Sequence, residues 1–333
     1  MITVPSPQIS FIVPCYNYAR YLPDCLSSIF NQRGDFDFEV IAIDDASTDN
    51  TAEVLRSFSD PRLRVISHRI NEGHVGTINE GLREARGEFI ARIDPDDRYR
   101  SSFLSHVIEK FVAFPEVGLV YGDVSIIDDR GQITVERSDQ EHKGRDFKGN
   151  ELVRLLERNF ICAPSVIARR TAWLKALPVP DGLAFNDWYF TLMMAREHEF
   201  YFINKVLADY RVHSSNHHSS IVLNKTEEPS IFWLLDRIFS EQEKTSELEK
   251  EKRRARRRIY GSQCLNIADK YFGCGYDTDA RRCYLMALRY QSASRLDASL
   301  VRHLLATYIG RKAYESLKLS IKAVSAPLAR VRR

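Results

Sequence analysis

Short apolar runs alternate with amphipathic segments along the first part of the chain. The largely apolar residues at 9–13, 40–43 and 89–93 are typical of strands that are buried on both faces of a sheet. After the first run, Leu22 and Leu26 recur on one face of a helix. Strands that alternate with helices are characteristic of a parallel sheet covered by helices. The pattern therefore predicts an α/β fold.

The pattern changes character after residue 221. From there, apolar residues recur at helical spacing among many charges, so residues 241–258 are expected to form a solvated helix and residues 262–290 a helical hairpin. We therefore expect an α/β domain at 1–221 and a helical extension at 222–333. The other expected elements are helices at 101–114, 151–157, 171–177 and 185–194, strands at 117–121, 124–127 and 200–206, a turn at 128–131 and a loop at 136–149.

Acidic residues cluster where the predicted strands end. The second strand stops at Asp44 and Asp45, and the third leads into Asp94, Asp96 and Asp97. In sheets of this kind ligands bind beyond the carboxyl ends of the strands. Crowded carboxylates repel one another unless a cation lies between them, and Mg²⁺ and Mn²⁺ prefer such oxygen ligands. The third strand end therefore predicts a divalent metal site, and the alternative is a solvated acidic turn.

Composition narrows the setting of the protein. With 333 residues, the chain is long enough for one large domain and an appendage. We find no run of about eighteen apolar residues and no signal pattern in residues 1–8, so we expect a cytoplasmic protein. The six cysteines show no C-x-x-C spacing, so we expect reduced thiols and no zinc site.

Charge is unevenly distributed along the chain. Residues 222–333 hold 23 Lys and Arg against 13 Asp and Glu, whereas residues 1–221 hold 25 against 32. A basic extension on an acidic domain indicates contact with something anionic. The segment 301–333 is either a helix that packs on the α/β domain or a basic helix that lies on the inner face of the plasma membrane. Nucleic acid is not expected as a partner, because no recognised binding motif accompanies the basic run.

Several motifs, taken in order, resemble glycosyltransferase family 2. Each is a weak signal alone, and the set in this order is a strong one. The resemblance covers residues 8–220 and implies a GT-A fold, with a mainly parallel, Rossmann-like sheet, and a nucleotide-sugar donor, for which we expect a UDP-sugar. The motifs are the strand and loop at 9–17, Ile-Asp-Asp-Ala-Ser-Thr-Asp at 43–49, Asn-Glu-Gly at 71–73 and again at 79–81, and Asp-Pro-Asp-Asp at 94–97.

The same resemblance implies roles on the donor side of a site. Asp96 is the first candidate for direct ligation of Mn²⁺ or Mg²⁺, with Asp94 acting through the ribose or a water. His213 follows Tyr-Arg, as in a Tyr-Arg-x-His segment of the family, and is a further candidate ligand. Asp45 resembles the position that binds the nucleobase, and Tyr16 could stack on it or simply pack in its loop. The full set of donor-binding candidates is Pro14, Tyr16, Asn17, Asp45, Asn79, Asp94 and Arg211.

Asp187 lies at the start of a predicted helix. It could cap that helix, as Asp often does. In the family, this position usually carries an acidic pair whose second member deprotonates the acceptor hydroxyl, and here Asn186 replaces the first acid. The resemblance therefore implies Asp187 as a general base in an inverting displacement. A second departure is Ile78, where members often have a phosphate-contacting arginine; His74 or Arg92 could substitute.

These observations predict an inverting, metal-dependent hexosyltransferase. It would move a sugar from a nucleotide-diphosphate donor to a hydroxyl of a saccharide or lipid-linked acceptor, in synthesis of a bacterial surface polysaccharide or glycolipid. A peripheral position at the membrane is compatible with the basic extension. The alternatives are a nucleotidyltransferase, which would need a glycine-rich, lysine-bearing loop after the first strand, and a non-catalytic module that binds nucleotide sugars.

Overall fold

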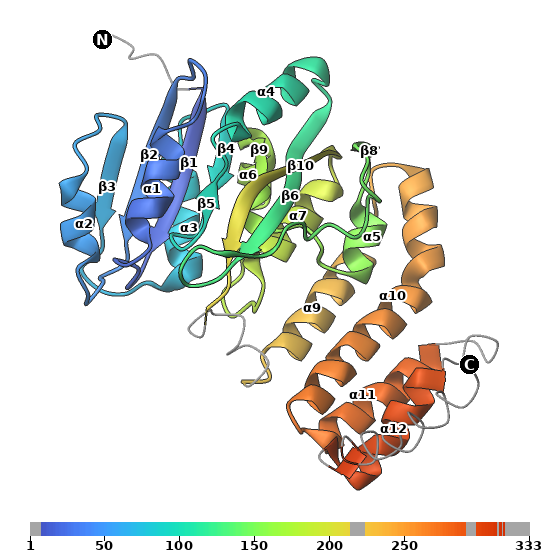
Figure 1. Cartoon of the computed structure of the whole chain (residues 1–333). Helices are drawn as coiled ribbons and strands as arrows, with labels where there is room; N and C mark the ends of the chain where they lie inside the picture. The colour runs from blue at the N-terminus through green and yellow to red at the C-terminus, as the bar shows by residue number, and fades with distance from the viewer. Residues whose placement is uncertain (1–7, 214–223, 291–297, 312, 315, 317–333) are drawn as a thin grey trace, which may run out of the picture. The chain divides into compact units, whose positions relative to one another are not determined.

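The chain folds into two compact units, which are described separately. The α/β unit comprises residues 1–155 and 159–216, and the helical unit comprises residues 156–158 and 217–333. The predicted boundary after residue 221 lies outside the described residues. The computed structural model describes residues 8–213, 224–290, 298–311, 313, 314 and 316 (Figure 1).

One mixed sheet forms the centre of the α/β unit. Its strands are β1 (Ile9–Cys15), β2 (Phe38–Asp44), β3 (Leu63–Ser67), β4 (Phe89–Arg92), β5 (Arg98–Tyr99), β6 (Val117–Ile127), β7 (Ile133–Val135), β8 (Phe147–Gly149), β9 (Ile167–Arg169) and β10 (Glu199–Arg211). Their order is β3-β2-β1-β4-β9-β6-β10-β5, with β7 beside β6 and β8 beside β10. Strands β3, β2, β1 and β4 are parallel, β6 is parallel to β10, and β9 runs antiparallel to its neighbours.

Helices cover both faces of this sheet (Figure 1). Every residue of β1 is buried, because alternate side chains point into two different cores. Phe11 and Val13 belong to the core that includes α1, α2 and α4, whereas Ile12 faces α3 so closely that a Cβ on Gly81 would lie 2.6 Å from it. The predicted α/β fold is thereby confirmed. The helices are α1 (Leu22–Phe30), α2 (Thr51–Ser57), α3 (Gly73–Glu84), α4 (Phe103–Ala113), α5 (Leu152–Glu157), α6 (Arg170–Lys175) and α7 (Asn186–Ala195).

Two expectations for the middle of the chain were wrong. The strands predicted at 117–121 and 124–127 form one continuous strand, β6, which passes through Gly122 and Asp123. A glycine fits position 122 of this strand because the Leu207 side chain fills the space beside it. Atoms of Leu207 lie 2.5 Å from where a Cβ on residue 122 would be. The predicted loop at 136–149 ends in β8, which pairs with β10. Asp123 anchors this segment by accepting hydrogen bonds from the backbone of residues 138 and 139, at 2.9 and 2.8 Å.

The helical unit confirms the predicted helical extension. Its helices are α9 (Glu227–Ser240), α10 (Ser246–Gly273), α11 (Asp277–Tyr290) and α12 (Ala298–Ile309). Helices α10 and α11 form the expected hairpin. The remainder of the predicted segment 301–333 lies mostly outside the described residues. None of the helices in the described part of the chain has the length and hydrophobicity required to cross a bilayer.

Within the helical unit, the charged segment and the first arm of the hairpin form a single helix, α10. It begins after Thr245, whose hydroxyl accepts a hydrogen bond from the Leu248 amide at 3.2 Å. The segment is only partly solvated, because the Lys252 side chain is buried. Its ammonium group binds Glu243 at 2.5 Å and Glu249 at 3.1 Å. Lys252 therefore belongs to a buried ionic cluster, against the expectation of a fully solvated helix.

Candidate functional site

The loop after β4 gathers three carboxylates in a largely buried position. The amide of Asp97 closes a turn onto the carbonyl of Asp94 at 3.0 Å, and only 4% of Asp96 and 1% of Asp97 are exposed. Burial, together with the charge of Asp94, raises the pKa of Asp96 above its usual range. Burial and the charge of Asp96 raise the pKa of Asp97 further. The loop therefore concentrates negative charge where water cannot offset it.

The end of β10 lies against this acidic loop. The Arg211 amide donates to the Asp97 carboxylate at 2.8 Å, and the Arg211 Nε donates to the Asp96 carbonyl at 2.7 Å. His213 Nε2 lies 2.9 Å from Asp96 Oδ2, and its ring stacks on Tyr21 with the centroids 5.1 Å apart. The structure thus brings Asp96 and His213 together, as the sequence predicted.

Asp94 and Arg211 have more specific surroundings than the sequence indicated. The Asp94 carboxylate lies 3.6 Å from Arg92 Nη2 and 4.0 Å from His74 Nε2. Arg211 is 2% exposed, and its guanidinium also donates to the Asp128 carbonyl at 3.1 Å and lies over the Tyr21 ring. Arg211 therefore ties the end of β10 to the acidic loop, and its predicted contact with the donor stays a prediction.

The loop after β1 carries the candidates for the nucleobase pocket. Pro14 is buried, whereas Tyr16 is 45% exposed. Asn17 has a φ of 60°, in the left-handed region that Asn tolerates better than most residues. Its side-chain oxygen accepts a hydrogen bond from the Thr48 amide at 2.7 Å. The ends of β1 and β2 are thereby joined, and the Tyr16 ring is presented to solvent.

Asp45, at the end of β2, is 2% exposed and holds the start of α3. Its two carboxylate oxygens accept hydrogen bonds from the amides of Glu72 at 2.7 Å and Gly73 at 2.9 Å. The same carboxylate lies 2.7 Å from His68 Nδ1, and His68 Nε2 lies 2.5 Å from Glu80. Burial opposes ionisation, but these hydrogen bonds lower the pKa of Asp45 overall. The sequence did not single out His68, which belongs to no motif, and it gave no role to Glu80, which lies within the Asn-Glu-Gly motif at 79–81.

His68 also forms the one group of ligand atoms, within the described residues, that lie close enough together to hold a metal ion. The group consists of His68, Glu72 and Glu80, with all atoms within 4.8 Å of one another. It is distinct from the predicted ligands Asp94, Asp96 and His213. Asn79, one residue before Glu80, is buried and accepts a hydrogen bond from the Val179 amide at 3.1 Å. Asn79 therefore joins α3 to the segment before α7 in this structure.

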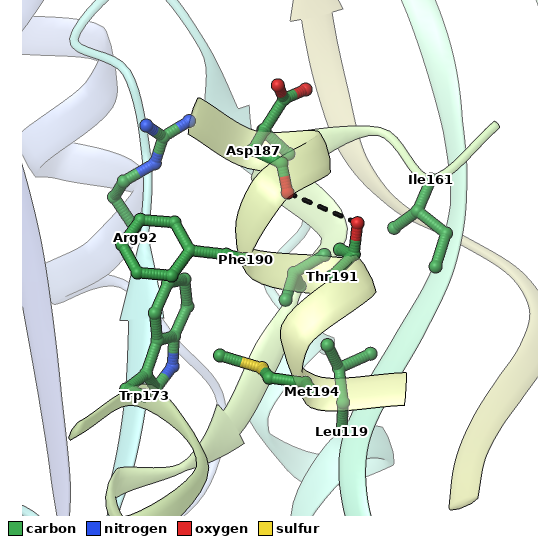
Figure 2. A pocket seen from close by; sticks show the side chains of 10 residues that line it. Arg92, Leu119, Ile161, Trp173, Asp187, Phe190, Thr191 and Met194 are labelled. Carbon is green, nitrogen blue, oxygen red and sulfur yellow. Dashed lines mark hydrogen bonds between the residues drawn. The ribbon is translucent and has the colours of Figure 1, made fainter. Parts of the chain in front are cut away.

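Asp187 lies in the first turn of α7. The N-cap of this helix is Phe185, and its cap makes no side-chain hydrogen bond, so the capping interpretation of Asp187 was wrong. Asp187 instead lines a small pocket, and its carboxylate accepts a hydrogen bond from Asn159 Nδ2 at 3.3 Å. The Asp187 carbonyl accepts a hydrogen bond from the Thr191 hydroxyl (Figure 2). The Asp187 side chain is thus partly exposed at the edge of this pocket.

The pocket beneath Asp187 is mainly apolar and has room for about one water molecule, with a volume of about 20 Å³. Figure 2 shows Arg92 and Asp187 toward one end and Trp173, Met194 and Leu119 toward the other. An apolar wall beside two charged groups can exclude water from a reacting centre.

Arg92, at the end of β4, connects this pocket to the acidic loop. Its Nη1 donates to the Asn186 side chain at 2.8 Å and lies 3.3 Å from His74, while Nη2 approaches Asp94. Ile78, by contrast, is fully buried in the core. Arg92 and Asn186 are 94 residues apart in sequence. The acidic loop and the start of α7 are therefore distant along the chain but meet at the Arg92 guanidinium. The arrangement can therefore hold an anion and a cation side by side and accept a proton nearby.

Comparison with known proteins places this geometry in context. The family model described as "Glycosyl transferase family 2" matches residues 10–177. An uncharacterized glycosyltransferase of Nostoc is 29% identical over 64% of this chain and 67% of its own length. The succinoglycan biosynthesis protein ExoO of Rhizobium meliloti is 30% identical over 57% of this chain and 56% of its own. A poly-beta-1,6-N-acetyl-D-glucosamine synthase of Staphylococcus epidermidis is 32% identical over 35% and 29%. This chain thus spans less than two thirds of the latter two relatives.

Solved structures share the fold at lower identity. The S. aureus TarS 1-349 structure in complex with UDP-GlcNAc has a TM-score of 0.62 and 17% identity, over 94% of this chain and 92% of that one. The mannosyltransferase PcManGT of Pyrobaculum calidifontis, in complex with GDP-Man and Mn²⁺, has a TM-score of 0.60 and 18% identity, over 94% and 84%. At this identity the likeness concerns the fold.

Proposed function

The chain belongs to glycosyl transferase family 2, and we propose that it transfers a hexose from a nucleotide sugar to a hydroxyl group of an acceptor. The observation that carries the proposal is the position of Arg92. It lies 3.6 Å from Asp94, on the predicted donor side, and 2.8 Å from Asn186, next to Asp187. A donor and an acceptor bound at these two places would meet at one point.

The donor side has the chemistry to hold a divalent ion, Mn²⁺ or Mg²⁺. Asp96 and His213, whose ligand atoms lie 2.9 Å apart, would be its ligands, and Asp94 would act through a water, because the three side chains do not bring their ligand atoms within 4.8 Å of one another. A buried oxygen of Asp97, Oδ2, has no hydrogen-bond partner in the described part of the chain. This is what we expect of a loop that binds a cation. When bound, such an ion offsets the negative charge that develops on the leaving diphosphate. The mannosyltransferase PcManGT, whose structure is in complex with GDP-Man and Mn²⁺, supports a divalent ion on this side.

The nucleotide lies across the ends of β1 and β2 in this proposal. The exposed ring of Tyr16 stacks on the base, and Pro14 and Asn17 shape the adjoining loop. Asp45 and Asn79 contribute by holding α3 in place on the same side of the site. UDP is the proposed nucleotide, and the TarS structure in complex with UDP-GlcNAc supports that choice.

On the acceptor side, Asp187 is the proposed general base. The acceptor oxygen attacks the anomeric carbon, its proton passes to Asp187, and the bond from that carbon to the diphosphate breaks. Because the attack and departure occur on opposite faces, the single displacement inverts the anomeric configuration. A base of this kind contributes about two to four powers of ten in rate.

The biological setting follows from the relatives and from charge. Relatives named for succinoglycan biosynthesis and for poly-beta-1,6-N-acetyl-D-glucosamine synthesis support a saccharide or lipid-linked acceptor in bacterial polysaccharide assembly. The balance of 23 basic to 13 acidic residues in 222–333 supports peripheral attachment to the anionic inner face of the membrane. Flotation with anionic and with neutral liposomes tests this attachment, and equal recovery with both would contradict it.

A donor screen tests the proposed activity. The protein is incubated with Mn²⁺ and a panel of UDP-, GDP-, CDP- and dTDP-sugars, and release of the nucleoside diphosphate is measured. Release is expected with at least one donor, and Asp187→Asn should lower its rate by about two to four powers of ten while donor affinity is kept. A nucleotidyltransferase would instead release pyrophosphate in the presence of a nucleoside triphosphate, and a binding module would bind a donor without releasing product.

A further inference from the structure

Arg92 combines a buried position with unused hydrogen-bonding capacity. Its side chain is 6% exposed. Arg92 is the last residue of β4 and lies two residues before Asp94, which belongs to the acidic loop. Its hydrogen-bond contacts with described residues, Asn186 and His74, both use Nη1. A guanidinium has five donors in a rigid fork, so Nε and Nη2 retain donors for another acceptor.

The direct hydrogen-bond acceptor of Arg92 is a neutral group. Asn186 offers an amide oxygen at 2.8 Å, and the one ion pair within 4 Å that Arg92 makes in the described part of the chain is the longer approach to Asp94. A carboxylate at position 186 would form a short ion pair in this buried place and would hold the guanidinium there. The amide positions the guanidinium without neutralising it.

The acidic loop creates a need for such a cation. A diphosphate that enters beside Asp94, Asp96 and Asp97 brings further negative charge to a place where Asp96 and Asp97 are only 4% and 1% exposed, so water cannot offset that charge. Arg211, the other arginine at this loop, is occupied by the carbonyls of Asp96 and Asp128. Arg92 has the planar, forked geometry that matches phosphate oxygens.

We propose that Arg92 binds the diphosphate of the donor and that Asn186 keeps it available by holding it through a neutral contact. This inference rests on the proposed function and names the residue that binds the anionic part of its substrate. Ile78 cannot fill the role, because its aliphatic side chain has no charge and no hydrogen-bond donor and packs in the core. The same guanidinium also sets the distance between the diphosphate and Asp187, because Asn186 precedes Asp187 at the start of α7.

Calorimetric titration with Mn²⁺ and UDP, GDP, CDP or dTDP tests the proposal, together with the matching nucleoside as a probe without phosphates. For whichever diphosphate binds, Arg92→Gln should weaken binding by at least about tenfold, as expected for a lost charge-assisted contact, and leave the nucleoside unaffected. Arg92→Lys should weaken it less, because the charge remains without the fork. Asn186→Asp should also weaken diphosphate binding, and the exposed Arg33→Gln should not.

The outcomes separate this inference from the proposed function. If Arg92→Gln and Asn186→Asp both bind the diphosphate within about twofold of the unaltered chain, Arg92 is not the phosphate-binding residue. If Arg92→Gln loses the nucleoside as strongly as the diphosphate, Arg92 acts only through the fold. If the unaltered chain binds none of the four diphosphates, the proposed function itself is overturned and this inference with it.

Discussion

Asp45→Ala should destabilise the α/β unit strongly, because one buried carboxylate holds three groups. The substitution removes the acceptor of the Glu72 and Gly73 amides, at 2.7 and 2.9 Å, and the partner of His68 at 2.7 Å. A hydrogen bond to a charged group contributes about 1.5–3 kcal/mol, and the substitution removes the acceptor of both backbone donors and of His68. We expect a loss of about 3–5 kcal/mol in the free energy of unfolding, out of a total of about 5–15 kcal/mol for a typical domain.

The pH dependence of this contribution can be worked out from the two partners. The pKa of Asp45 is lowered from 3.8 in the folded chain, so its contribution is present above that value and is lost as the pH falls through the lowered pKa. For His68, burial acts to lower the pKa, but hydrogen bonds from its ring to the carboxylates of Asp45 and Glu80 raise the pKa above 6.5. Its contribution is present below 6.5 and is lost as the pH rises through the raised pKa. The full stabilisation by the Asp45 and His68 pair is therefore expected between pH 3.8 and pH 6.5.

Urea unfolding at pH 5 and pH 9 measures this effect. Asp45→Ala should lose more stability at pH 5, where His68 is charged, than at pH 9, and Asp45→Asn should lose less because it keeps one acceptor. The exposed Asp35→Asn serves as a control and should change stability by less than about 0.5 kcal/mol. A loss below about 1 kcal/mol for Asp45→Ala at pH 5 would show that the α3 start does not depend on this carboxylate.

Two further predictions concern the acidic loop and the helical unit. His213→Ala should raise the Mn²⁺ concentration for half-maximal product release by at least about tenfold, whereas His106→Ala on α4 should not; equal Mn²⁺ requirements would exclude His213 as a ligand. Lys252→Met should cost about 3–5 kcal/mol in thermal unfolding, because it leaves Glu243 buried beside it without its cation. The exposed Lys250→Met should be nearly neutral, and a similarly small loss for both would contradict the buried cluster.

The sequence predicted the strands that are buried on both faces, but it divided one of them, β6, into two. β1 and β2 were recognisable because such strands need apolar residues at nearly every position. β6 was split because Gly122 and Asp123 are typical of a turn. In the structure, Leu207 fills the space beside Gly122, and Asp123 is buried with an ion pair to Arg137 at 2.6 Å. Both facts depend on residues distant in sequence, so no local pattern could reveal them.

The candidate site divides in the same way. Asp94 and Asp96 could be proposed because they follow a strand within one short motif, and Asp187 because its position resembles that of the general base in the family. His68 could not, since its contact with Asp45 spans 23 residues and arises from the register of β2 and β3, which pairs Asp44 with Ser67. The link from Arg92 to Asn186 spans 94 residues and likewise requires the fold. These contacts depend on how the strands pair and how the helices pack. A single sequence does not reveal either.

The acidic loop contains buried carboxylates that destabilise the fold, and they lie where the proposed substrate would bind. Asp96 and Asp97 are buried and their pKa values are raised, so their charge opposes folding at neutral pH. The end of β10 offsets part of that cost through Arg211 and His213, which reach the loop across more than a hundred residues of sequence. A ligand that brings positive charge to the loop would offset more of it. Binding and local stability are therefore coupled at this point, and the coupling has the sign that favours a cation over an empty loop.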